Sequence, residues 1–325
     1  MSPSESNGEP TSIEVQDSIP VIDYSLLTSG IPNERSKVVQ DIGKACEDWG
    51  CFMLVNHGIP ETLIQEMMGI SDEFFNMTKE EKLEFEAHGV FDPIRCTSGL
   101  NLVNQNKDTL WRECLRLIVH PDFNCPLKPP GLSELAFDYV KRTRAIALEL
   151  VKGVSESLGF EASYMNHELN LDASFQLLAI NYYPSILEFD ASRGLIQHTD
   201  HGLLTLLYEN GVPGLEVLHN GKWVGIGSIP NAFFIISADH LEIFSNGKYK
   251  GKFHRTVMKD ERKRITLVNT NGPSLDTIVG PSSRLVDGEN RPPRYLPMKY
   301  SEYLECQTRL VTAGKHPFDE IRIHI

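Results

Sequence analysis

Features that define several classes of protein are missing from this sequence of 325 residues. No apolar run approaches the ~20 residues of a transmembrane helix, and the polar, acidic residues 1–18 do not form a signal peptide. The formal net charge is −13 and lysine and arginine form no basic block, which argues against binding to nucleic acid or to a membrane. We therefore expect a cytoplasmic protein whose residues 1–18 form a disordered leader.

Cysteine is sparse, and no Cys-x-x-Cys spacing occurs. Six cysteines scattered over the chain favour free, mostly buried thiols over a disulfide framework. Internal repeats and low-complexity tracts are also missing. A hydrophobic content of 41% and a charged content of 23% are ordinary for a globular protein. The length alone allows either one large core or two small ones.

The first half of the chain shows the spacing of amphipathic helices. Apolar residues recur at helical intervals in three segments, 34–49, about 60–75 and 132–158. The apolar run 51–55 predicts a buried strand, and the segment 111–121 is partly strand-like. Residues from about 87 to 106 have no clear periodicity and contain Gly, Pro and Asn, so we interpret them as a loop.

The pattern changes near residue 175, where short apolar segments alternate with Gly, Pro and Asn. Strands are predicted at 176–183, 203–208, 215–218, 223–225, 232–237, 252–257 and 264–270. Many short strands separated by turns are typical of a sandwich or barrel, and a last helix is predicted near 298–310. The simplest architecture is mainly β and forms one domain over residues 19–325. Its parts are a mostly helical N-terminal wrapper (19–170), a jelly-roll core (171–297) and a C-terminal helix and tail (298–325).

One motif in the second half carries potential metal ligands. His198-x-Asp200 directs an imidazole and a carboxylate to one point if both lie on a strand, because residues two apart share a face. A third ligand is available at His254. Two histidines and a carboxylate form the facial triad of mononuclear non-haem Fe(II) oxygenases. Zinc uses the same ligands, and each part of the motif alone is more often a surface turn or a hydrogen-bonded pair.

A second pair of residues favours iron over zinc. Arg264 and Thr266 lie two apart, and Arg264 follows His254 by ten residues. The Arg264 guanidinium could hold a carboxylate through two charge-assisted hydrogen bonds. Zinc-dependent hydrolysis does not need such a clamp, whereas an iron enzyme with an anionic co-substrate does. The residues together therefore indicate an oxygenase whose metal ligands point into the barrel.

Several motifs together resemble the plant-type 2-oxoglutarate- and Fe(II)-dependent dioxygenases over nearly all of the chain. They are Ile19-Pro20-Val21-Ile22-Asp23, Trp49-Gly50-Cys51-Phe52, Val55-Asn56-His57-Gly58, Asn181-Tyr182-Tyr183-Pro184, His198-Thr199-Asp200, Ser245-Asn246-Gly247-Lys248-Tyr249 and His254-Arg255. The resemblance implies a double-stranded β-helix core like that of isopenicillin N synthase. It also implies that His198, Asp200 and His254 bind Fe(II) and carry the catalysis.

The same resemblance implies a site for the co-substrate. Arg264, helped by Tyr183 and Thr266, is expected to bind the distal carboxylate of 2-oxoglutarate, with Asn181 in support. The sequence departs from the family's pattern near this site, since Arg-Ile-Thr stands where Arg-x-Ser is usual, and Thr keeps the hydroxyl donor. The bulky His201 follows the metal motif, and we expect it on the opposite strand face and not as a fourth ligand.

The resemblance further implies the reaction. With 2-oxoglutarate, O₂ and ascorbate as reductant, such an enzyme releases succinate and CO₂ and hydroxylates an unreactive C–H bond; desaturation, demethylation, ring closure and epoxidation begin in the same way. A small, largely apolar specialised metabolite is the expected substrate, bound by a monomer. The candidate contacts, which more often serve ordinary packing, are Phe91, Ile94, Trp111 and Val268.

Two other functions stay open at this point. A relative such as the ethylene-forming oxidases shares the metal triad but oxidises a bound amino acid with ascorbate. Stoichiometric release of succinate would exclude it. A non-catalytic small-molecule binder on the same barrel has no need of three convergent metal ligands. Absence of O₂ consumption with any ligand would favour that function.

Overall fold

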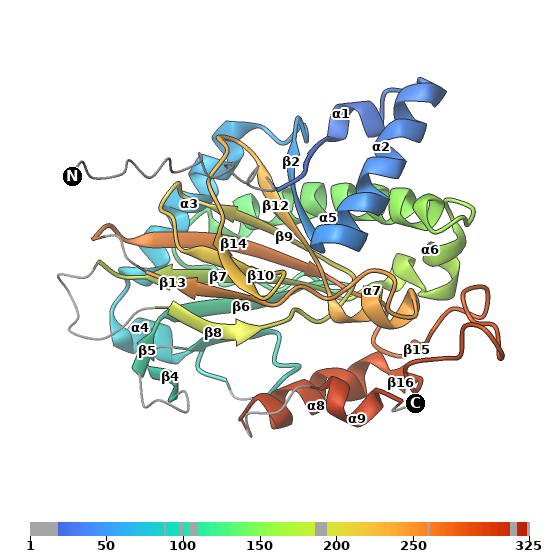
Figure 1. Ribbon diagram of the computed structural model, residues 1–325. Coiled ribbons are helices and arrows are strands. Elements are labelled where there is room, and N and C mark those ends of the chain that lie inside the picture. The colour runs from blue at the N-terminus through green and yellow to red at the C-terminus, as the bar shows by residue number, and fades with distance from the viewer. Residues whose placement is uncertain are drawn as a thin grey trace, which may run out of the picture.

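Two β-sheets face each other, and helices cover the outer face of the larger one (Figure 1). The computed structural model describes residues 19–87, 89–97, 100–103, 109–185, 194–258, 261–312 and 317–323. The predicted leader, residues 1–18, lies outside the described residues. The fold matters for function because each sheet contributes part of the candidate site.

The larger sheet has eight strands. Their spatial order is β1 (Val21–Asp23), β2 (Cys51–Val55), β12 (Phe233–Ser237), β9 (Leu204–Glu209), β14 (Arg264–Asn271), β7 (Gln176–Tyr183), β6 (Glu113–His120) and β3 (Ile94–Thr97). Only β1 and β2 are parallel neighbours in this sheet. Four of the eight strands, β1, β2, β3 and β6, come from the segment predicted as a mostly helical wrapper. Because strands from both parts of the chain interleave in one sheet, we infer a single domain.

The smaller sheet has four strands. Their order is β11 (Lys222–Gly225), β10 (Leu215–His219), β13 (His254–Val257) and β8 (Gly194–His198). The inner faces of the two sheets meet in an apolar cluster that includes Leu207 and Phe234 of the larger sheet and Leu215 and Val217 of the smaller one. This sheet-on-sheet packing confirms the jelly-roll core expected from the sequence.

Three long helices, α2 (Pro32–Lys44), α3 (Glu61–Phe75) and α5 (Leu132–Ser157), pack against the outer face of the larger sheet. A fourth long helix, α8 (Tyr300–Thr312), instead packs Tyr300 and Leu304 against Leu177 on the other face. The short ones are α1 (Tyr24–Leu27), α4 (Lys79–Leu83), α6 (Tyr164–Glu168), α7 (Asp239–Phe244) and α9 (Phe318–Ile321), with a π-helical turn at Ala45–Trp49 and a 3₁₀ turn at Leu171–Ala173. Ile42 of α2, Ile64 of α3 and Leu150 of α5 are fully buried in the main core with Leu178 of β7. In Figure 1, α8 and α9 lie together at a separate end of the molecule.

The predicted helices agree with α2 and its π-helical turn, α3, α5 and α8 to within a few residues. The predicted loop at 87–106 is wrong, because it contains β3 and β4 (Leu100–Val103). Strand β3 pairs with β6, and β4 pairs with β5 (Thr109–Trp111). Each of these strands is too short to show a period in the sequence, and tertiary pairing stabilises it. A last small sheet joins β15 (Ile278–Val279) to β16 (Met298–Lys299).

Two expectations from composition can be compared with the structure. All six cysteines are free and five of them are buried, as predicted. In the described part of the chain, no helix combines the length and the apolar character needed to cross a membrane.

Candidate metal centre and co-substrate site

Two adjacent strands of the smaller sheet bring the candidate histidines together. His198 is the last residue of β8, and His254 is the first residue of β13. The two residues are direct partners across this antiparallel pair, so their side chains leave the sheet on the same face. Their ring centroids are 4.2 Å apart. Strand register thus joins two residues that are far apart in the sequence.

Asp200 completes the group from the loop after β8. Its Oδ1 lies 3.6 Å from His198 Nε2 and 3.7 Å from His254 Nε2. One ligand atom from each of the three residues lies within 4.8 Å of the other two. The prediction that Asp200 shares a strand with His198 is wrong, because β8 ends at His198. The main chain instead holds the loop, since the Asp239 amide donates to the Asp200 carbonyl at 2.9 Å.

Backbone carbonyls orient both imidazoles. His198 Nδ1 lies 2.8 Å from the Ile196 carbonyl oxygen, and His254 Nδ1 lies 3.0 Å from that of Lys252. A carbonyl only accepts, so each Nδ1 carries a proton, and in the neutral form of each ring Nε2 keeps a lone pair for a metal ion. Metal-binding histidines commonly use this arrangement to fix ring and tautomer.

The electrostatics of the group also suit a cation. Burial and the neighbouring His254 lower the pKa of His198 to about 3, so its ring is neutral near pH 7. Burial alone raises the pKa of Asp200, but His254 and His198 outweigh this effect and the net shift is downward. Among the residues that the structure describes, the buried second carboxylate oxygen, Oδ2, has no hydrogen-bond partner. Two imidazoles with Nδ1 bonded to main-chain carbonyls, an ionised carboxylate and its buried second oxygen are a donor set that fits a divalent metal ion.

Gly202 shapes the loop that carries Asp200. Its φ is +88°, and a Cβ there would lie 2.8 Å from the Asn271 carbonyl oxygen. We expect Gly202→Ala to destabilise the fold by about 1–3 kcal/mol, because a non-glycine residue is strained at this φ and clashes with main chain. Displacement of the loop should also weaken metal binding, which thermal melting and metal content measure.

Gly211 provides the matched control for this substitution. It has a similar φ of +75°, but nothing lies within 4 Å of its added Cβ. Gly211→Ala therefore introduces the strain without the clash and leaves the metal loop in place. Equal effects of the two substitutions on metal content would refute the role given to Gly202.

His201 is not part of the metal group. Its Nδ1 lies 2.8 Å from the Tyr300 hydroxyl oxygen, and burial lowers its pKa to about 4. The three-residue metal group does not include it. Nearby, His240 packs edge-to-face between Tyr300 and Tyr303, with ring centroids 4.5 Å away in both cases. Both histidines thus serve the packing beneath the metal loop.

The predicted carboxylate clamp, Arg264, is fully buried at the start of β14. Its Nε donates to the Val212 carbonyl at 3.0 Å, and its Nη2 pairs with Glu209 Oε2 at 2.7 Å. The guanidinium carbon lies 5.5 Å from the centre of the Tyr183 ring. Among the described residues, Nη1 has no hydrogen-bond partner. The guanidinium is therefore held in place while one nitrogen stays available to a ligand.

Side-chain hydrogen bonds hold each of the other predicted co-substrate residues. Arg112 Nη1 donates to Asn181 Oδ1 at 2.6 Å, and Asn181 Nδ2 donates to Thr266 Oγ1 at 3.1 Å. The Tyr183 hydroxyl donates to Thr256 Oγ1 at 3.4 Å, which links the larger sheet to β13 two residues beyond His254. The sequence predicted Asn181, Thr266 and Tyr183 but missed the roles of Arg112 and Glu209.

Comparison with known proteins now decides the family. The family model described as "non-haem dioxygenase in morphine synthesis N-terminal" matches residues 19–132. The model of the 2OG-Fe(II) oxygenase superfamily matches residues 174–273. The 2-oxoglutarate-dependent dioxygenase 19 of Oryza sativa subsp. japonica is 41% identical over 306 residues, which cover 94% of this chain and 90% of that protein. The chain belongs to the family of 2-oxoglutarate- and Fe(II)-dependent dioxygenases.

Other relatives agree with this result. Flavanone 3-dioxygenase 2 of Oryza sativa subsp. japonica is 35% identical to this chain over 292 residues, which cover 88% of this chain and 82% of that protein. The crystal structure of JOX2 in complex with 2OG, Fe and JA superposes with a TM-score of 0.81 at 25% identity, covering 94% of this chain and 89% of that one. A rice dioxygenase for auxin oxidation has the same fold, with a TM-score of 0.75 at 23% identity over 94% of this chain and all of that one.

The four predicted substrate contacts of the dioxygenase do not all come together. Val268 packs with the apolar cluster between the sheets, and Phe91 packs with Phe175, Leu177 and Tyr300. Ile94 instead lies on the outer face of the larger sheet, against the helical core, because it pairs with Leu117. The side chain of Trp111 lies outside the described residues. Ile94 is therefore not a substrate contact in this structure.

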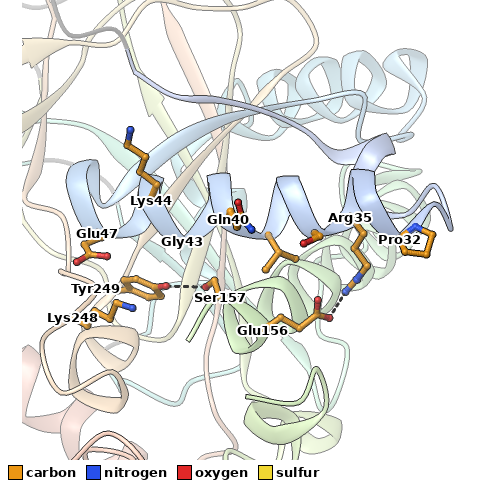
Figure 2. A pocket seen from close by; sticks show the side chains of 12 residues that line it. Pro32, Arg35, Gln40, Gly43, Lys44, Glu47, Glu156, Ser157, Lys248 and Tyr249 are labelled. Atoms are coloured by element: carbon orange, nitrogen blue, oxygen red, sulfur yellow. Dashed lines mark hydrogen bonds and ion pairs between the residues drawn. The ribbon is translucent and has the colours of Figure 1, made fainter. Parts of the chain in front are cut away.

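A separate cleft of about 660 Å³ lies on the helical side of the dioxygenase. Figure 2 shows the Tyr249 hydroxyl hydrogen-bonded to Ser157 at 2.9 Å and Arg35 paired with Glu156 at 2.7 Å across its lining. None of the metal or clamp residues lines this cleft. It is therefore distinct from the candidate active site.

Proposed function

We propose that the dioxygenase binds Fe(II) through His198, Asp200 and His254 and binds 2-oxoglutarate through Arg264. It then uses O₂ to hydroxylate a small, largely apolar metabolite and releases succinate and CO₂, with ascorbate as reductant. The observation that supports this proposal most strongly is the convergence of the three ligand atoms within 4.8 Å of one another. This group lies between the same two sheets that hold the buried guanidinium.

His198, Asp200 and His254 would hold the iron, and the iron would supply the activation of O₂. The protein orients the reactants. The carbonyls of Ile196 and Lys252 hold the two imidazoles so that Nε2 faces the metal position. No side-chain motion is needed to assemble the ligands, which favours rapid metal binding and a fixed orientation.

The clamp residues hold the far end of the keto acid. Thr266 Oγ1 accepts a hydrogen bond from Asn181 Nδ2. The hydroxyl proton of Thr266 can therefore be donated to the co-substrate carboxylate. Tyr183, Val212 and Met258 form a small apolar cluster around the Arg264 guanidinium. These apolar side chains exclude water, which strengthens a charge-assisted hydrogen bond from Arg264 to the carboxylate.

Apolar side chains on the inner face of the larger sheet favour the proposal of an organic substrate. Phe91, Leu177 and Tyr300 belong to one apolar cluster, which also contains Ile118 and Ala179. Such a surface suits the carbon skeleton of a small metabolite. Val268 extends the same face toward the centre of the sheet.

The test is anaerobic reconstitution of the full chain with Fe(II) and 2-oxoglutarate, followed by O₂ and a library of plant metabolites. We expect one succinate per oxidised product, with a mass increase of one oxygen atom by mass spectrometry. Oxidation that requires ascorbate and consumes no 2-oxoglutarate would indicate an ascorbate-dependent oxidase instead. Absence of O₂ consumption with every compound, in protein that retains bound iron, would indicate a non-catalytic binder.

A further inference from the structure

Two arginines stand directly opposite each other at the edge of the larger sheet. Arg95 of β3 and Arg116 of β6 are register partners in an antiparallel pair. Like charges at such positions repel each other and destabilise the strand pairing. Both side chains are half-buried, so solvent screens the repulsion only in part. This arrangement needs an explanation that packing does not give.

The two arginines lie on the inner face of the sheet. Arg116 pairs with Ala179 of β7, Ala179 pairs with Val268 of β14, and Val268 pairs with Leu207 of β9. Val268 and Leu207 pack against the smaller sheet in the inner apolar cluster. Because direct partners across a sheet share a face, Arg95 and Arg116 face the same interior as the metal group.

Arg116 also lies on the strand that reaches the metal loop. Ile118, two residues further along the same face of β6, packs in the cluster that contains Tyr300, and the Tyr300 hydroxyl lies 2.8 Å from Nδ1 of His201, the residue after Asp200. The pair is separate from the 2-oxoglutarate clamp, because Arg264 and Val268 are four residues apart along β14, about 13 Å in an extended strand. The inner face therefore carries a second cationic position at a distance from the first.

The part of the chain that the structure describes places no carboxylate in an ion pair at this second position. Two buried cations do have such a partner, since Lys82 pairs with Glu113 and Arg264 with Glu209, both at 2.7 Å, whereas buried Arg112 donates to Asn181. Among the described residues, neither Arg95 nor Arg116 forms an ion pair, and the hydrogen bond that Arg95 donates goes to the Gly89 carbonyl at 3.0 Å.

The neighbouring acid does not remove the imbalance. Asp92 accepts a hydrogen bond from the Gly89 amide at 2.6 Å, and its charge raises the pKa of Arg95 by less than burial and Arg116 lower it. Burial, and after it the charge of Arg116, lowers the pKa of Arg95. Two partly desolvated guanidiniums for which the described residues supply no ion pair are suited to binding an anion.

Apolar residues adjoin the pair and complete the site. Ile118 follows Arg116 by two residues on the same face of β6, and its partner Leu177 belongs to the apolar cluster that contains Phe91 and Tyr300. A ligand that spans both regions has an anionic group at one end and a carbon skeleton beside it.

We infer that Arg95 and Arg116 bind the carboxylate of the organic substrate, so that the dioxygenase oxidises a small organic acid with an apolar body. This inference rests on the proposed function and specifies its substrate class. The carboxylate would accept charge-assisted hydrogen bonds from both guanidiniums, while the apolar body packs on Phe91, Ile118 and Leu177. The fixed carboxylate then determines which C–H bond reaches the metal.

The experiment compares aryl-alkanoic acids of increasing chain length with their uncharged primary amides. Dissociation constants are measured by calorimetry on the full chain loaded with Fe(II) and 2-oxoglutarate without O₂. We expect at least one acid to bind tighter than its amide by about tenfold to a hundredfold, as charge-assisted hydrogen bonds allow. If no acid in the series binds tighter than its amide, the inference is wrong.

Substitutions connect this preference to the two arginines. Arg116→Gln and Arg95→Gln should each remove most of the preference for the acid and leave amide binding unchanged, while Arg116→Lys, which keeps the charge, should retain part of it. Arg142→Gln is the control, because Arg142 lies on the exposed side of α5 and pairs with Asp138. A preference that survives both glutamine variants would overturn the inference.

One further measurement separates the inference from the proposed function. Consumption of 2-oxoglutarate without substrate depends on the metal and on Arg264, so Arg116→Gln should leave its KM for 2-oxoglutarate unchanged. A rise in that KM would assign the arginine pair to the co-substrate and overturn the inference. If the unsubstituted enzyme consumes no 2-oxoglutarate at all, the proposed function fails instead.

Discussion

His254→Ala is expected to reduce turnover more than a hundredfold and to abolish stable Fe(II) binding. Loss of an outer partner of a metal ligand already costs about 10–100-fold, and this change removes a ligand itself. The same result is expected for His198→Ala and Asp200→Ala, since the three residues contribute one ligand atom each. Succinate formation, metal content and circular dichroism measure activity, binding and fold.

A histidine outside the metal group provides the control for these variants. His219 lies on β10 of the same small sheet, where its ring stacks on Trp49 at 3.7 Å. His219→Ala removes an imidazole from this sheet without removing a metal ligand, so bound iron should stay at the level of the unsubstituted protein. If a folded His254→Ala variant keeps more than a tenth of the activity, His254 is not a ligand.

Arg264→Ala is expected to raise the KM for 2-oxoglutarate by about a hundredfold. Truncation of one partner in a buried, hydrogen-bonded charge pair typically costs 2–5 kcal/mol, and each 1.4 kcal/mol corresponds to a tenfold change. The effect should appear mainly in KM, because the guanidinium is expected to bind the carboxylate far from the reacting carbon. Initial rates over a range of 2-oxoglutarate concentrations provide the measurement.

Stability must be separated from binding in this experiment, because Arg264→Ala also leaves the partly buried Glu209 without its ion-pair partner. Arg264→Lys keeps the positive charge but loses the two-pronged geometry, so its KM should lie between those of the alanine variant and the unsubstituted enzyme. Arg284→Ala serves as the control, since Arg284 is exposed and pairs with Glu161 at 2.8 Å. An unchanged KM in folded Arg264→Ala protein would exclude Arg264 as the clamp.

Local signals in the sequence predicted much of the fold and the candidate metal group. The helices α3 and α5 could be predicted because their apolar spacing repeats over several turns. His198, Asp200 and His254 could be predicted because their types and order are specific to one chemistry. The strand environment of Asp200 was predicted wrongly, because the sequence does not show that β8 ends one residue after Gln197.

Long-range pairing accounts for what the sequence did not predict. Arg112 binds Asn181 and Glu209 binds Arg264, and these pairs are 69 and 55 residues apart in the sequence. Only the register of β6 on β7, and of β9 on β14, brings them together. The error at Ile94 has the same origin, because a shift of one residue in register moves a side chain to the other face of a sheet.

The division of the site between two sheets has a consequence for co-substrate choice. The metal ligands extend from the smaller sheet and its following loop, whereas Arg264 extends from the larger one. The interior side chains between the sheets, such as Leu207 and Val217, therefore set the distance between the proposed metal ligands and the proposed clamp. If both proposals hold, we expect a shorter or longer dicarboxylic keto acid to bind more weakly than 2-oxoglutarate, because the thickness of the sandwich would set the length of the carbon chain.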